Sequence, residues 1–433
     1  MITVAVRADV SRLSAAERTI LFDRSTSADP AIRAATARLI ERVRLEGDAA
    51  LMAMAREFDG ASLEALEVPR TAWRRALETL DPTLIAALER AAENIRQVHE
   101  AFKPVAREVV TADGVVVGRR PDPLARVGVY APGGRATYPS SLLMGAVPAR
   151  VAGVGTVIVC SPPTATGLPA AVLLAAAEIA GVDRMFAVGG AGAIAALAFG
   201  TNSIPRVDRI VGPGNAYVAE AKLQVAGTVA IDSPAGPSEL LVIADEFADA
   251  DVIAREIVAQ AEHDPLAAVV LVTTAPLLID AVERALAPLI ATTPRAMIVR
   301  EALAARGGLV TAATLAEAEA FAAEYAGEHV LVACRDGDGV TARLRNAGTV
   351  FVGTANSVAF GDYLSGANHV LPTGGLARSY SGLSTIDFYR WTTWQRVDRA
   401  AAARLAADVG ILADAEGLPG HAATARHWME GTP

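Results

Sequence analysis

Short apolar runs that alternate with alanine-rich stretches dominate the chain from about residue 125 onward. Four of these runs, at 126–132, 155–163, 184–190 and 208–214, are mostly apolar at consecutive positions and end in Gly or Pro. Continuous apolar runs are typical of parallel strands covered by helices on both faces, and the alternation is the βαβ pattern. We therefore expect a parallel sheet whose ligands bind at the carboxyl ends of its strands.

A second set of similar runs follows, which predicts a second α/β unit. Strands are expected at 239–245, 267–274, 328–334 and 348–353, separated by helices such as 250–260. Beyond Gly374 the strand pattern is lost, and the last sixty or so residues are expected to be helices with an alanine-rich face and a tail interrupted by Gly and Pro.

The chain before this region is expected to be helical. Asp81 can cap a helix with Pro82 in its first turn. Apolar residues at helical spacing then predict a buried stripe of Leu84, Leu88, Ala91, Ile95, Val98 and Phe102. His99, between Gln97 and Glu100, is interpreted as a solvated residue of the same helix.

Composition narrows the class of protein. The chain has 433 residues, of which 52% are hydrophobic and 20% charged, yet its apolar runs are broken before the roughly 18 residues that a membrane span needs. Its first residues lack the uninterrupted apolar region of a signal peptide, so we expect a cytoplasmic protein. The net charge of −9, without a basic cluster, argues against nucleic acid and anionic lipid and favours a small-molecule substrate.

The two cysteines, Cys160 and Cys334, lie far apart and form no CxxC motif. A disulfide scaffold and a thiolate zinc site are therefore not expected. Any metal ion would have to use nitrogen and oxygen ligands.

Glycine clusters close several of the predicted strands, at 131–134, 189–192, 212–215 and 234–238. Glycine lets backbone amides approach an anion, so such loops suit a pyrophosphate, although each cluster alone could equally be a tight turn. Residues 190–195 fit the pattern GxGxxA of dinucleotide-binding folds, but no acidic residue about twenty positions later ends a clean second strand.

Two groups of residues have the nitrogen and oxygen atoms that a borderline ion such as zinc accepts. Gln260 and His263 share one face at a helix end, and Asp362 and His369 lie in a Gly-rich segment. Spacing alone does not join the two groups, and each histidine could instead be a hydrogen-bonding loop residue.

Further ionisable groups occur in pairs. Glu328 and His329 stand where a strand begins and could act as proton acceptors or simply cap the strand. Glu416 and His421 flank Gly-Leu-Pro-Gly, either as functional residues or in a disordered tail. Tyr130, at a strand end beside a glycine cluster, could pack on a cofactor or on the sheet.

Taken together, these segments resemble the histidinol dehydrogenase family. The matching strings occur in family order from about residue 125 to 425: VGVYAPGG, GGAGAIAALAFGT, VGPGNAYVAEAK, IDSPAGPSELLVIAD, AQAEHDP, EHVLV, GDYLSGANHVLPT and EGLPGHA. The resemblance implies an α/β fold with two incomplete Rossmann-like domains and small helical C-terminal domains, in an intertwined homodimer with shared active sites.

The resemblance also implies domain boundaries. One Rossmann-like domain would combine 27–130 with 238–383 and carry most zinc and catalytic residues, and 131–237 would form a second, NAD-binding domain. Residues 1–26 and 384–411 would form a small helical domain, and 412–433 a tail that reaches the partner subunit.

Site residues carry over by position. One Zn²⁺ per subunit would be bound by Gln260, His263, Asp362 and, from the partner subunit, His421. These ligands, together with Ser238, His329, His369 and Glu416, would surround the substrate, a small amino alcohol. Tyr130 and Asn215 match NAD-contacting positions, and Gly192 stands where the family has a glutamine that contacts NAD.

The implied reaction is the last step of histidine biosynthesis, the four-electron oxidation of L-histidinol to L-histidine through bound histidinal with two NAD molecules. His329 would remove the hydroxyl proton and Glu328 would activate water. Gly192, Gly327 in place of a family proline, and residues 388–396 depart from the family pattern. Loss of one amide contact at position 192 would cost about 1 kcal/mol of NAD binding.

These departures keep open a paralogous zinc- and NAD-dependent dehydrogenase that acts on another small alcohol. A zinc hydrolase would need no NAD and would turn over substrate without it. A protein that only binds a nucleotide would lose no activity on substitution of Glu328 or His329.

Overall fold

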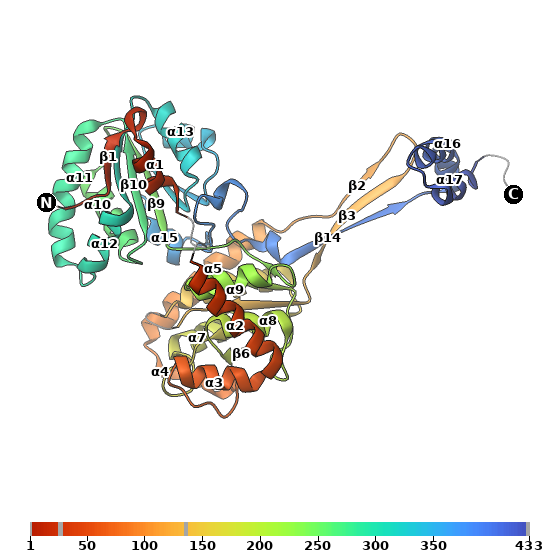
Figure 1. Ribbon diagram of the computed structural model, residues 1–433, viewed down its shortest axis with the longest axis horizontal. Helices are drawn as coiled ribbons and strands as arrows, with labels where there is room; N and C mark the ends of the chain where they lie inside the picture. Colours follow the sequence, from red (N-terminus) through yellow and green to blue (C-terminus); the bar gives the residue numbers. More distant parts are fainter. Residues whose placement is uncertain (1, 25–28, 134–136, 430–433) are drawn as a thin grey trace. The chain divides into compact units, whose positions relative to one another are not determined.

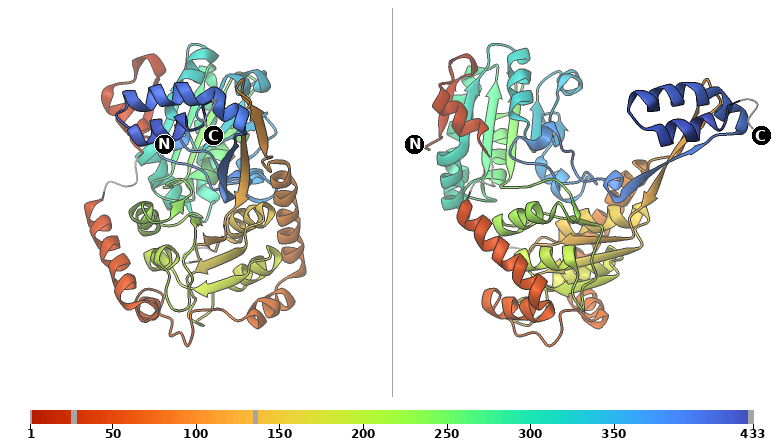
Figure 2. Two further views of the ribbon diagram at one scale, coloured as in Figure 1. Left: turned by 90° about the vertical axis from the view of Figure 1, so that its right-hand side faces the viewer. Right: turned by 45° about the vertical axis from the view of Figure 1, so that its right-hand side comes forward.

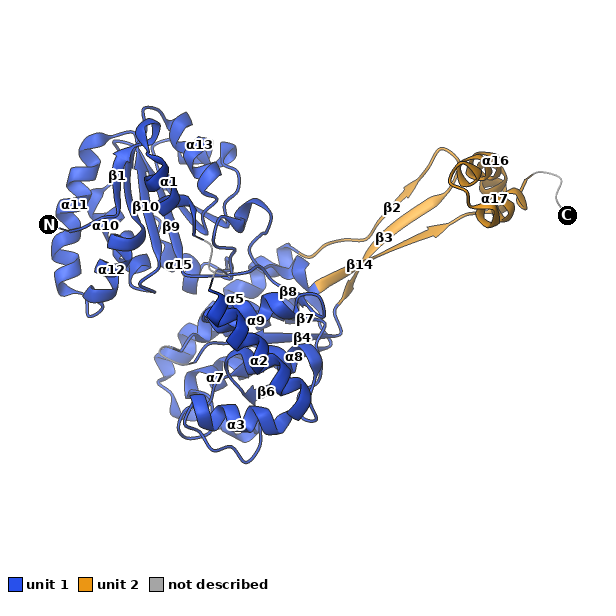
Figure 3. Cartoon of the chain, in the orientation of Figure 1, with its two compact units in different colours: residues 1–102, 124–388 blue, residues 103–123, 389–433 orange. Residues whose placement is uncertain are grey.

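The computed structural model of the chain describes residues 2–24, 29–133 and 137–429 (Figure 1). The chain divides into two compact units (Figure 3). Unit 1 consists of residues 1–102 and 124–388, and unit 2 of residues 103–123 and 389–433. Each unit is described by itself below.

A parallel sheet of six strands, ordered β1-β11-β10-β9-β12-β13, forms one half of unit 1. Its strands are β1 (Val6–Asp9), β11 (Gly307–Thr311), β10 (Ala268–Thr273), β9 (Glu239–Ala244), β12 (His329–Ala333) and β13 (Thr349–Val352). Chain order reverses between β9 and β12, as it does at the switch point of a Rossmann-like sheet.

Helices cover both faces of this sheet (Figure 2). Because successive side chains of a strand point to opposite faces, Leu240 and Val242 join one core while Leu241 and Ile243 join the other. The first core is closed by α10 (Ala250–Ala261), α11 (Pro276–Thr292) and α12 (Ala296–Arg306), and the second by α1 (Ala15–Phe22), α13 (Leu315–Tyr325) and α14 (Gly337–Arg343). Strands buried on both faces explain the continuous apolar runs in the sequence.

A second parallel sheet, of five strands ordered β6-β5-β4-β7-β8, forms the other half of unit 1. Its strands are β4 (Arg126–Tyr130), β5 (Thr156–Ser161), β6 (Arg184–Ala187), β7 (Arg209–Val211) and β8 (Ala230–Ile231). The order reverses between β4 and β7, so the loops after these two strands flank the crevice where such sheets bind ligands.

Eight helices accompany this second sheet. They are α2 (Pro30–Glu46), α3 (Asp48–Phe58), α4 (Arg70–Thr79), α5 (Pro82–Ala101), α6 (Pro139–Ala152), α7 (Ala171–Ile179), α8 (Gly190–Phe199) and α9 (Ala216–Val225). Helices α2 and α3 pack on α8, while α5 packs on α6. The short helix α15 (Val358–Tyr363) and the 3-10 turns η1 (Val10–Arg12), η2 (Leu376–Arg378) and η3 (Thr385–Phe388) complete unit 1.

Unit 2 combines an antiparallel sheet with a helix pair. The sheet has the order β14-β3-β2, with strands β2 (Arg107–Val110), β3 (Val116–Pro123) and β14 (Tyr389–Arg396). The helices α16 (Arg399–Ala415) and α17 (Pro419–Arg426) pack on each other. Trp394 lies opposite Gly118, where a Cβ atom would stand 2.2 Å from its indole ring, so glycine leaves room for the indole.

All eight strands predicted from the apolar runs are present, which confirms the α/β class with two parallel sheets. The prediction that strand character ends at Gly374 was wrong, because β14 follows at Tyr389–Arg396. Its aromatic and β-branched residues favour a strand, and the alanine-rich sequence that predicts a helix begins only after it. Strands β1 and β11 were not predicted either, and they pair with each other across some 300 positions.

The predicted helix after Asp81 is present as α5, with the Asp81 side chain accepting a hydrogen bond from Thr83 N. His99, however, is only 1% exposed, so its interpretation as a solvated residue was wrong. Thr385, from the far end of unit 1, donates its backbone N–H to His99 Nδ1 and its hydroxyl to the His99 carbonyl. Leu84 and Phe102, predicted as core, are 39% and 51% exposed.

The packing also differs from the expected domain boundaries. Residues 6–9 form an edge strand of the six-stranded sheet and do not belong to a small helical domain. The helices between 30 and 101 accompany the five-stranded sheet, whereas the expected boundaries joined 27–130 to the other sheet. The apolar faces of these helices did not reveal which of two similar sheets they would cover.

Candidate functional site

The amino ends of β9 and β12 bring two carboxylates and an imidazole together. Glu328 and His329 are 7% and 4% exposed, and Glu239 opposite them is 2% exposed. The His329 Nδ1 atom lies 3.0 Å from the Glu239 carbonyl oxygen and 3.3 Å from Glu328 Oε2. A carbonyl oxygen only accepts hydrogen bonds, so Nδ1 carries a proton and Nε2 is the nitrogen available for chemistry.

Helix α15 adds a third carboxylate, and the segment after it adds a second imidazole. Asp362 Oδ1 lies 3.5 Å from His329 Nε2. His369 Nδ1 lies 2.7 Å from the Asp362 carbonyl oxygen, so it donates there, and its Nε2 then accepts a hydrogen bond from the Ser141 hydroxyl at 3.0 Å. Ser141 lies on α6, so this hydrogen bond joins a helix that packs on the five-stranded sheet to the segment that carries His369.

Gln260 and His263 lie at the end of α10, which leads back to the same amino edge. Gln260 is 2% exposed, and its Oε1 atom has no hydrogen-bond partner among the described residues. His263 follows the last turn of the helix and is exposed. A buried amide oxygen without a partner costs free energy unless a ligand satisfies it.

The charged side chains of this cluster shift one another's pKa values. Burial lowers the pKa of His329, but Glu328 and Asp362 outweigh it and hold that pKa well above its ordinary value. Burial raises the pKa of Asp362, but His329, then His369 and His263, bring it below its usual range. Asp362 is therefore a carboxylate near three imidazoles, an environment suited to a cation or to proton transfer.

The carboxyl edge of the five-stranded sheet forms a second candidate region. Tyr130, the last residue of β4, is 4% exposed and accepts a hydrogen bond from the Gly190 amide at 3.1 Å. Burial raises the pKa of its hydroxyl to about 12, so it stays neutral. Asn215 caps α9, with Oδ1 accepting from Tyr217 N and Val218 N, and its side chain is exposed.

A buried ion pair holds the glycine loop after β7. Gly212 N donates to Asp232 Oδ2 at 2.7 Å, Lys222 Nζ donates to the Gly212 carbonyl at 3.1 Å, and Lys222 pairs with Asp232. Gly212 has φ +114°, and a Cβ there would stand 2.2 Å from the Tyr130 carbonyl oxygen. The loop beside Asn215 can therefore approach β4 only with glycine at this position.

Gly192 is buried in the first turn of α8, against α3. A Cβ at this position would stand 2.9 Å from Met54 Sδ and 3.3 Å from Leu51 Cδ2. Helix α3 thus occupies the space that a side chain at position 192 would take. Only the backbone of Gly192 is left to contact a cofactor. Gly134, part of the first glycine cluster, lies outside the described residues.

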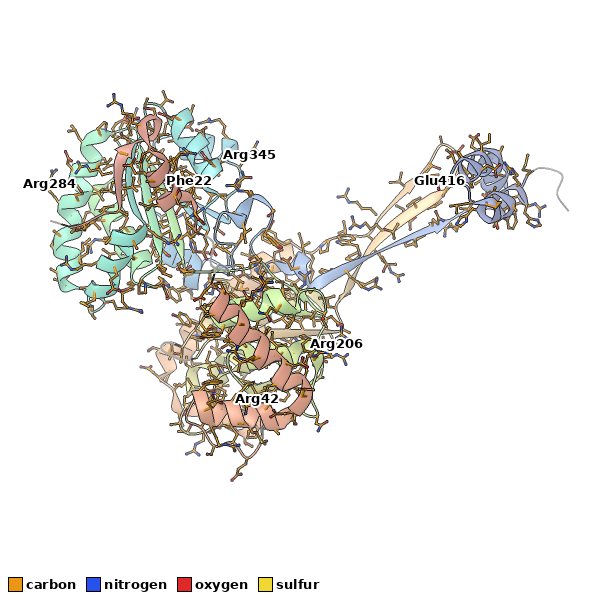
Figure 4. All side chains as sticks on the ribbon, in the orientation of Figure 1. Phe22, Arg42, Arg206, Arg284, Arg345 and Glu416 are labelled. Carbon is orange, nitrogen blue, oxygen red and sulfur yellow. The ribbon has the colours of Figure 1, made fainter. Side chains whose placement is uncertain are left out.

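The remaining expected site residues belong to both units of the chain. Ser238 directly precedes β9 and is half-buried. Glu416 and His421 are exposed and belong to unit 2, at the end of α16 and in α17 (Figure 4). Within residues 2–24, 29–133 and 137–429, no three His, Cys, Asp or Glu side chains form a group that could hold a metal ion.

A model of the histidinol dehydrogenase family matches residues 22–428. The chain belongs to this family. A histidinol dehydrogenase of Natronomonas pharaonis is 49% identical over 419 residues, covering 95% of this chain and 97% of the relative. One from Halobacterium salinarum is 47% identical over 416 residues, covering 96% and 97%. The crystal structure of histidinol dehydrogenase from Elizabethkingia anophelis has 32% identity and a TM-score of 0.94, covering 99% of this chain and 98% of that one.

Membership of the histidinol dehydrogenase family makes this chain an oxidoreductase. Among the described residues, none of the helices combines the length and the apolar character needed to cross a membrane. Both cysteines are buried and unpaired.

Two residues of the site escaped sequence reasoning. Glu239 was included in a predicted strand but not considered as a site residue, although a carboxylate at the head of an otherwise apolar run was a signal for a role. Arg24 pairs with it from beyond α1, and nothing in its local sequence marks it. Their proximity arises only when β9 and the segment after α1 meet in the tertiary structure.

Proposed function

We propose that the chain is a zinc- and NAD-dependent dehydrogenase that oxidises L-histidinol to L-histidine, the last step of histidine biosynthesis. The observation that carries this proposal is the buried pair Glu328 and His329 beside Asp362, in a chain of the histidinol dehydrogenase family. An imidazole whose Nδ1 is fixed by a carbonyl oxygen directs Nε2 toward the substrate. Zinc bound at Asp362 would offset the carboxylate charge that raises the pKa of His329, and so favour the neutral form that can act as a base.

The residues proposed to hold zinc fit such an ion. Gln260 Oε1 is a buried oxygen without a partner, and Asp362 is a carboxylate whose low pKa keeps it ionised. The charge of His263 lowers the pKa of Asp362, which indicates that the two residues lie near each other. Imidazole nitrogen, carboxylate and amide oxygen are ligands that zinc accepts.

The fourth proposed ligand, His421, and the substrate residue Glu416 belong to unit 2. We propose that a homodimer exchanges this unit, so that each site is completed by the partner subunit's Glu416 and His421. The helices that carry them support association because they expose apolar side chains, with Leu412 66% and Ile411 62% exposed. Such a dimer would act in the cytoplasm.

NAD is proposed to bind along the carboxyl edge of the five-stranded sheet, where Tyr130, the amides at the start of α8 and Asn215 lie. Gly212 in this edge is a position that only glycine can fill, as a close approach of backbone requires. When bound, zinc would supply a positive charge that anchors nitrogen atoms of the substrate, and NAD would supply the acceptor of one hydride in each oxidation.

The chain's own residues would move the protons. His329 Nε2 takes the hydroxyl proton as the alcohol carbon loses its hydride, which gives the aldehyde. Glu328 then takes a proton from the water that adds to the aldehyde carbon, and the hydrate loses a second hydride to give the carboxylate. One water is consumed and four electrons leave as two hydrides. Ser238, His369 and Glu416 are proposed to hold the polar groups of the substrate so that the aldehyde stays bound.

The decisive experiment is the stoichiometry of the reaction. Purified protein supplied with zinc, NAD and L-histidinol should produce close to two NADH per alcohol consumed, and a chelator that removes zinc should abolish turnover. One NADH, or none, would overturn the proposal. Turnover of another small alcohol in preference to L-histidinol would identify a paralogous dehydrogenase, and turnover without NAD would identify a hydrolase.

Substitutions test the roles of the two buried residues. His329→Asn and Glu328→Gln should lower kcat by at least about 100-fold with zinc content unchanged, because general acid–base groups contribute about 10²- to 10⁴-fold. Glu246→Gln, the same change at an exposed position just after β9, is the control. Unchanged kcat in both site variants would overturn the assignment of Glu328 and His329 as the acid–base groups, and the absence of turnover in the wild type as well would leave a nucleotide-binding protein.

A further inference from the structure

An ion pair that the proposed mechanism does not use lies directly behind the catalytic residues. Arg24 Nη1 donates to Glu239 Oε2 at 2.6 Å, and the two side chains are 2% and 3% exposed. The Arg24 guanidinium also donates to the Tyr325 carbonyl oxygen and stacks over the Tyr325 ring, 3.5 Å from its centroid. Removing two charges from water is costly, so such a pair calls for an explanation.

The backbone of Glu239 holds both proposed catalytic side chains. Its N–H donates to Glu328 Oε2 at 2.8 Å, and its carbonyl accepts from His329 Nδ1 at 3.0 Å. These two bonds orient the Glu328 carboxylate and determine which nitrogen of His329 is left for chemistry. The position of one peptide segment, at the start of β9, therefore controls the geometry of both groups.

The side chain of Glu239 fixes that segment in turn. Glu239 Oε2 accepts from the backbone N–H of Glu328 at 3.4 Å, which makes the contact between the two residues reciprocal. Glu239 Oε1 accepts from Gly374 N at 2.7 Å, in the segment that follows His369. One carboxylate thus joins the start of β9, the start of β12 and the segment after the histidine.

Arg24 supplies the charge that this arrangement needs. Glu239 and Glu328 are two buried carboxylates, each accepting a hydrogen bond from the backbone N–H of the other residue, and the charge of Glu328 disfavours the ionised form of Glu239. Burial raises the pKa of Glu239 to about 7 even though Arg24 opposes the shift. Only an ionised carboxylate accepts with both oxygens from two N–H groups and a guanidinium at once.

We propose that the buried Arg24–Glu239 pair is a positioning device that sets the orientation of Glu328 and His329 at the amino ends of β9 and β12. The roles of Glu328 and His329 rest on the proposed function, but the geometric part of the inference does not. Arg24 and Glu239 act through these two residues and are positioning residues.

The experiment separates positioning from stability. Arg24→Met and Glu239→Leu each leave one buried charge without its partner and should lower the thermal midpoint, whereas the double variant removes both charges and should recover most of it. In the double variant kcat should remain lower by about ten- to a hundred-fold, with KM for L-histidinol and zinc content near the wild-type values. Recovery of kcat together with the thermal midpoint would overturn the proposal.

A matched control uses another Arg–Glu pair of unit 1. Arg184 donates to Glu67 with two nitrogens and packs over Phe186, at the amino end of β6. The double variant Arg184→Met and Glu67→Leu changes the same residue types away from β9 and β12. It should leave kcat within about two-fold of the wild type.

A second measurement does not depend on the substrate. The chain has six histidines, so ¹⁵N-labelling of histidine gives few ring signals, and His329→Asn assigns those of His329. The Nδ1–H of His329 should exchange slowly with water in the wild type and rapidly in the Arg24→Met, Glu239→Leu double variant. An unchanged Nδ1–H signal in the double variant would overturn the positioning role. Loss of that signal in a protein that does not oxidise L-histidinol would overturn the proposed function alone.

Discussion

The substitution Gly192→Gln tests how far a family pattern can be transferred to this chain. Glutamine is the residue that the family resemblance implies at this position of the proposed NAD site, so a simple expectation is a gain in affinity. In the structure a Cβ at position 192 already stands 2.9 Å from Met54 Sδ and 3.3 Å from Leu51 Cδ2. Glutamine would add further atoms between α3 and α8.

The magnitude follows from opposing terms. Overpacking a dense interior costs about 1–3 kcal/mol. Replacing glycine inside a helix recovers about 0.5–1 kcal/mol. We therefore expect Gly192→Gln to lower the free energy of unfolding by about 1–2 kcal/mol and not to tighten NAD binding, because the side chain has no open path toward the carboxyl edge.

Urea unfolding and calorimetric titration with NAD measure the two quantities. Gly227→Gln is the matched control, since nothing lies within 4 Å of a Cβ at that exposed position. Met54→Ala removes the atom in conflict, so the double variant with Gly192→Gln should recover about 1 kcal/mol beyond the sum of the single changes. A Gly192→Gln protein as stable as the wild type, with several-fold tighter NAD binding, would refute this reasoning.

Three further predictions concern ionisable groups removed from water, namely His99, Asp59 and the Lys222–Asp232 pair. Burial lowers the pKa of His99 to about 4, so the folded state resists protonation and stability is lost as the pH falls from 6.5 toward 4. His99→Gln should remove up to about 3 kcal/mol of that loss in unfolding titrations at pH 7.5 and 4.5, and an identical pH dependence would contradict it. Burial raises the pKa of Asp59 to about 6, so ionisation destabilises the folded state as the pH rises from 4 to 6. Because Asp59 is only half-buried, solvent screens part of this effect, so Asp59→Asn should be more stable than the wild type by about 1 kcal/mol at pH 8 but not at pH 4, and an equal difference at both would count against the assignment. Lys222→Met combined with Asp232→Leu should weaken NAD binding by about ten-fold with zinc content unchanged, measured by titration, because Gly212 loses both of its side-chain partners. An unchanged affinity for NAD would show that this ion pair does not contribute to the proposed cofactor site.

The two candidate sites lie at opposite edges of their sheets, which the rule that ligands bind at the carboxyl ends of parallel strands did not reveal. Ligands of a parallel sheet are expected at the carboxyl ends of its strands, and Tyr130 and Gly212 lie there in the five-stranded sheet. Glu328 and His329 instead lie at the amino end of β12 in the six-stranded sheet. That position was visible in the sequence, since the pair precedes the apolar run, but its partner Glu239 on β9 was not.

Much of this protein is determined locally by its sequence. Strands covered by helices on both faces are apolar at nearly every position, so runs such as 239–245 and 267–274 could be recognised as strands from the sequence. The side chain of Asp81 and the ring of Pro82 fixed the start of α5 for similarly local reasons. Short strings around Gln260, Glu328 and Asp362 were enough to indicate the family and its expected site residues.

Only the tertiary structure decided which distant segments meet. Burial of His99 depends on Thr385, pairing of β1 depends on β11, and the environment of His329 depends on Glu239, whose charge is balanced by Arg24. The helices between 30 and 101 each have an apolar face, and the sequence pattern of these faces would suit either sheet equally well. A sequence pattern records the polarity and spacing of neighbouring residues, whereas these contacts depend on the shape and charge of surfaces that come together only on folding.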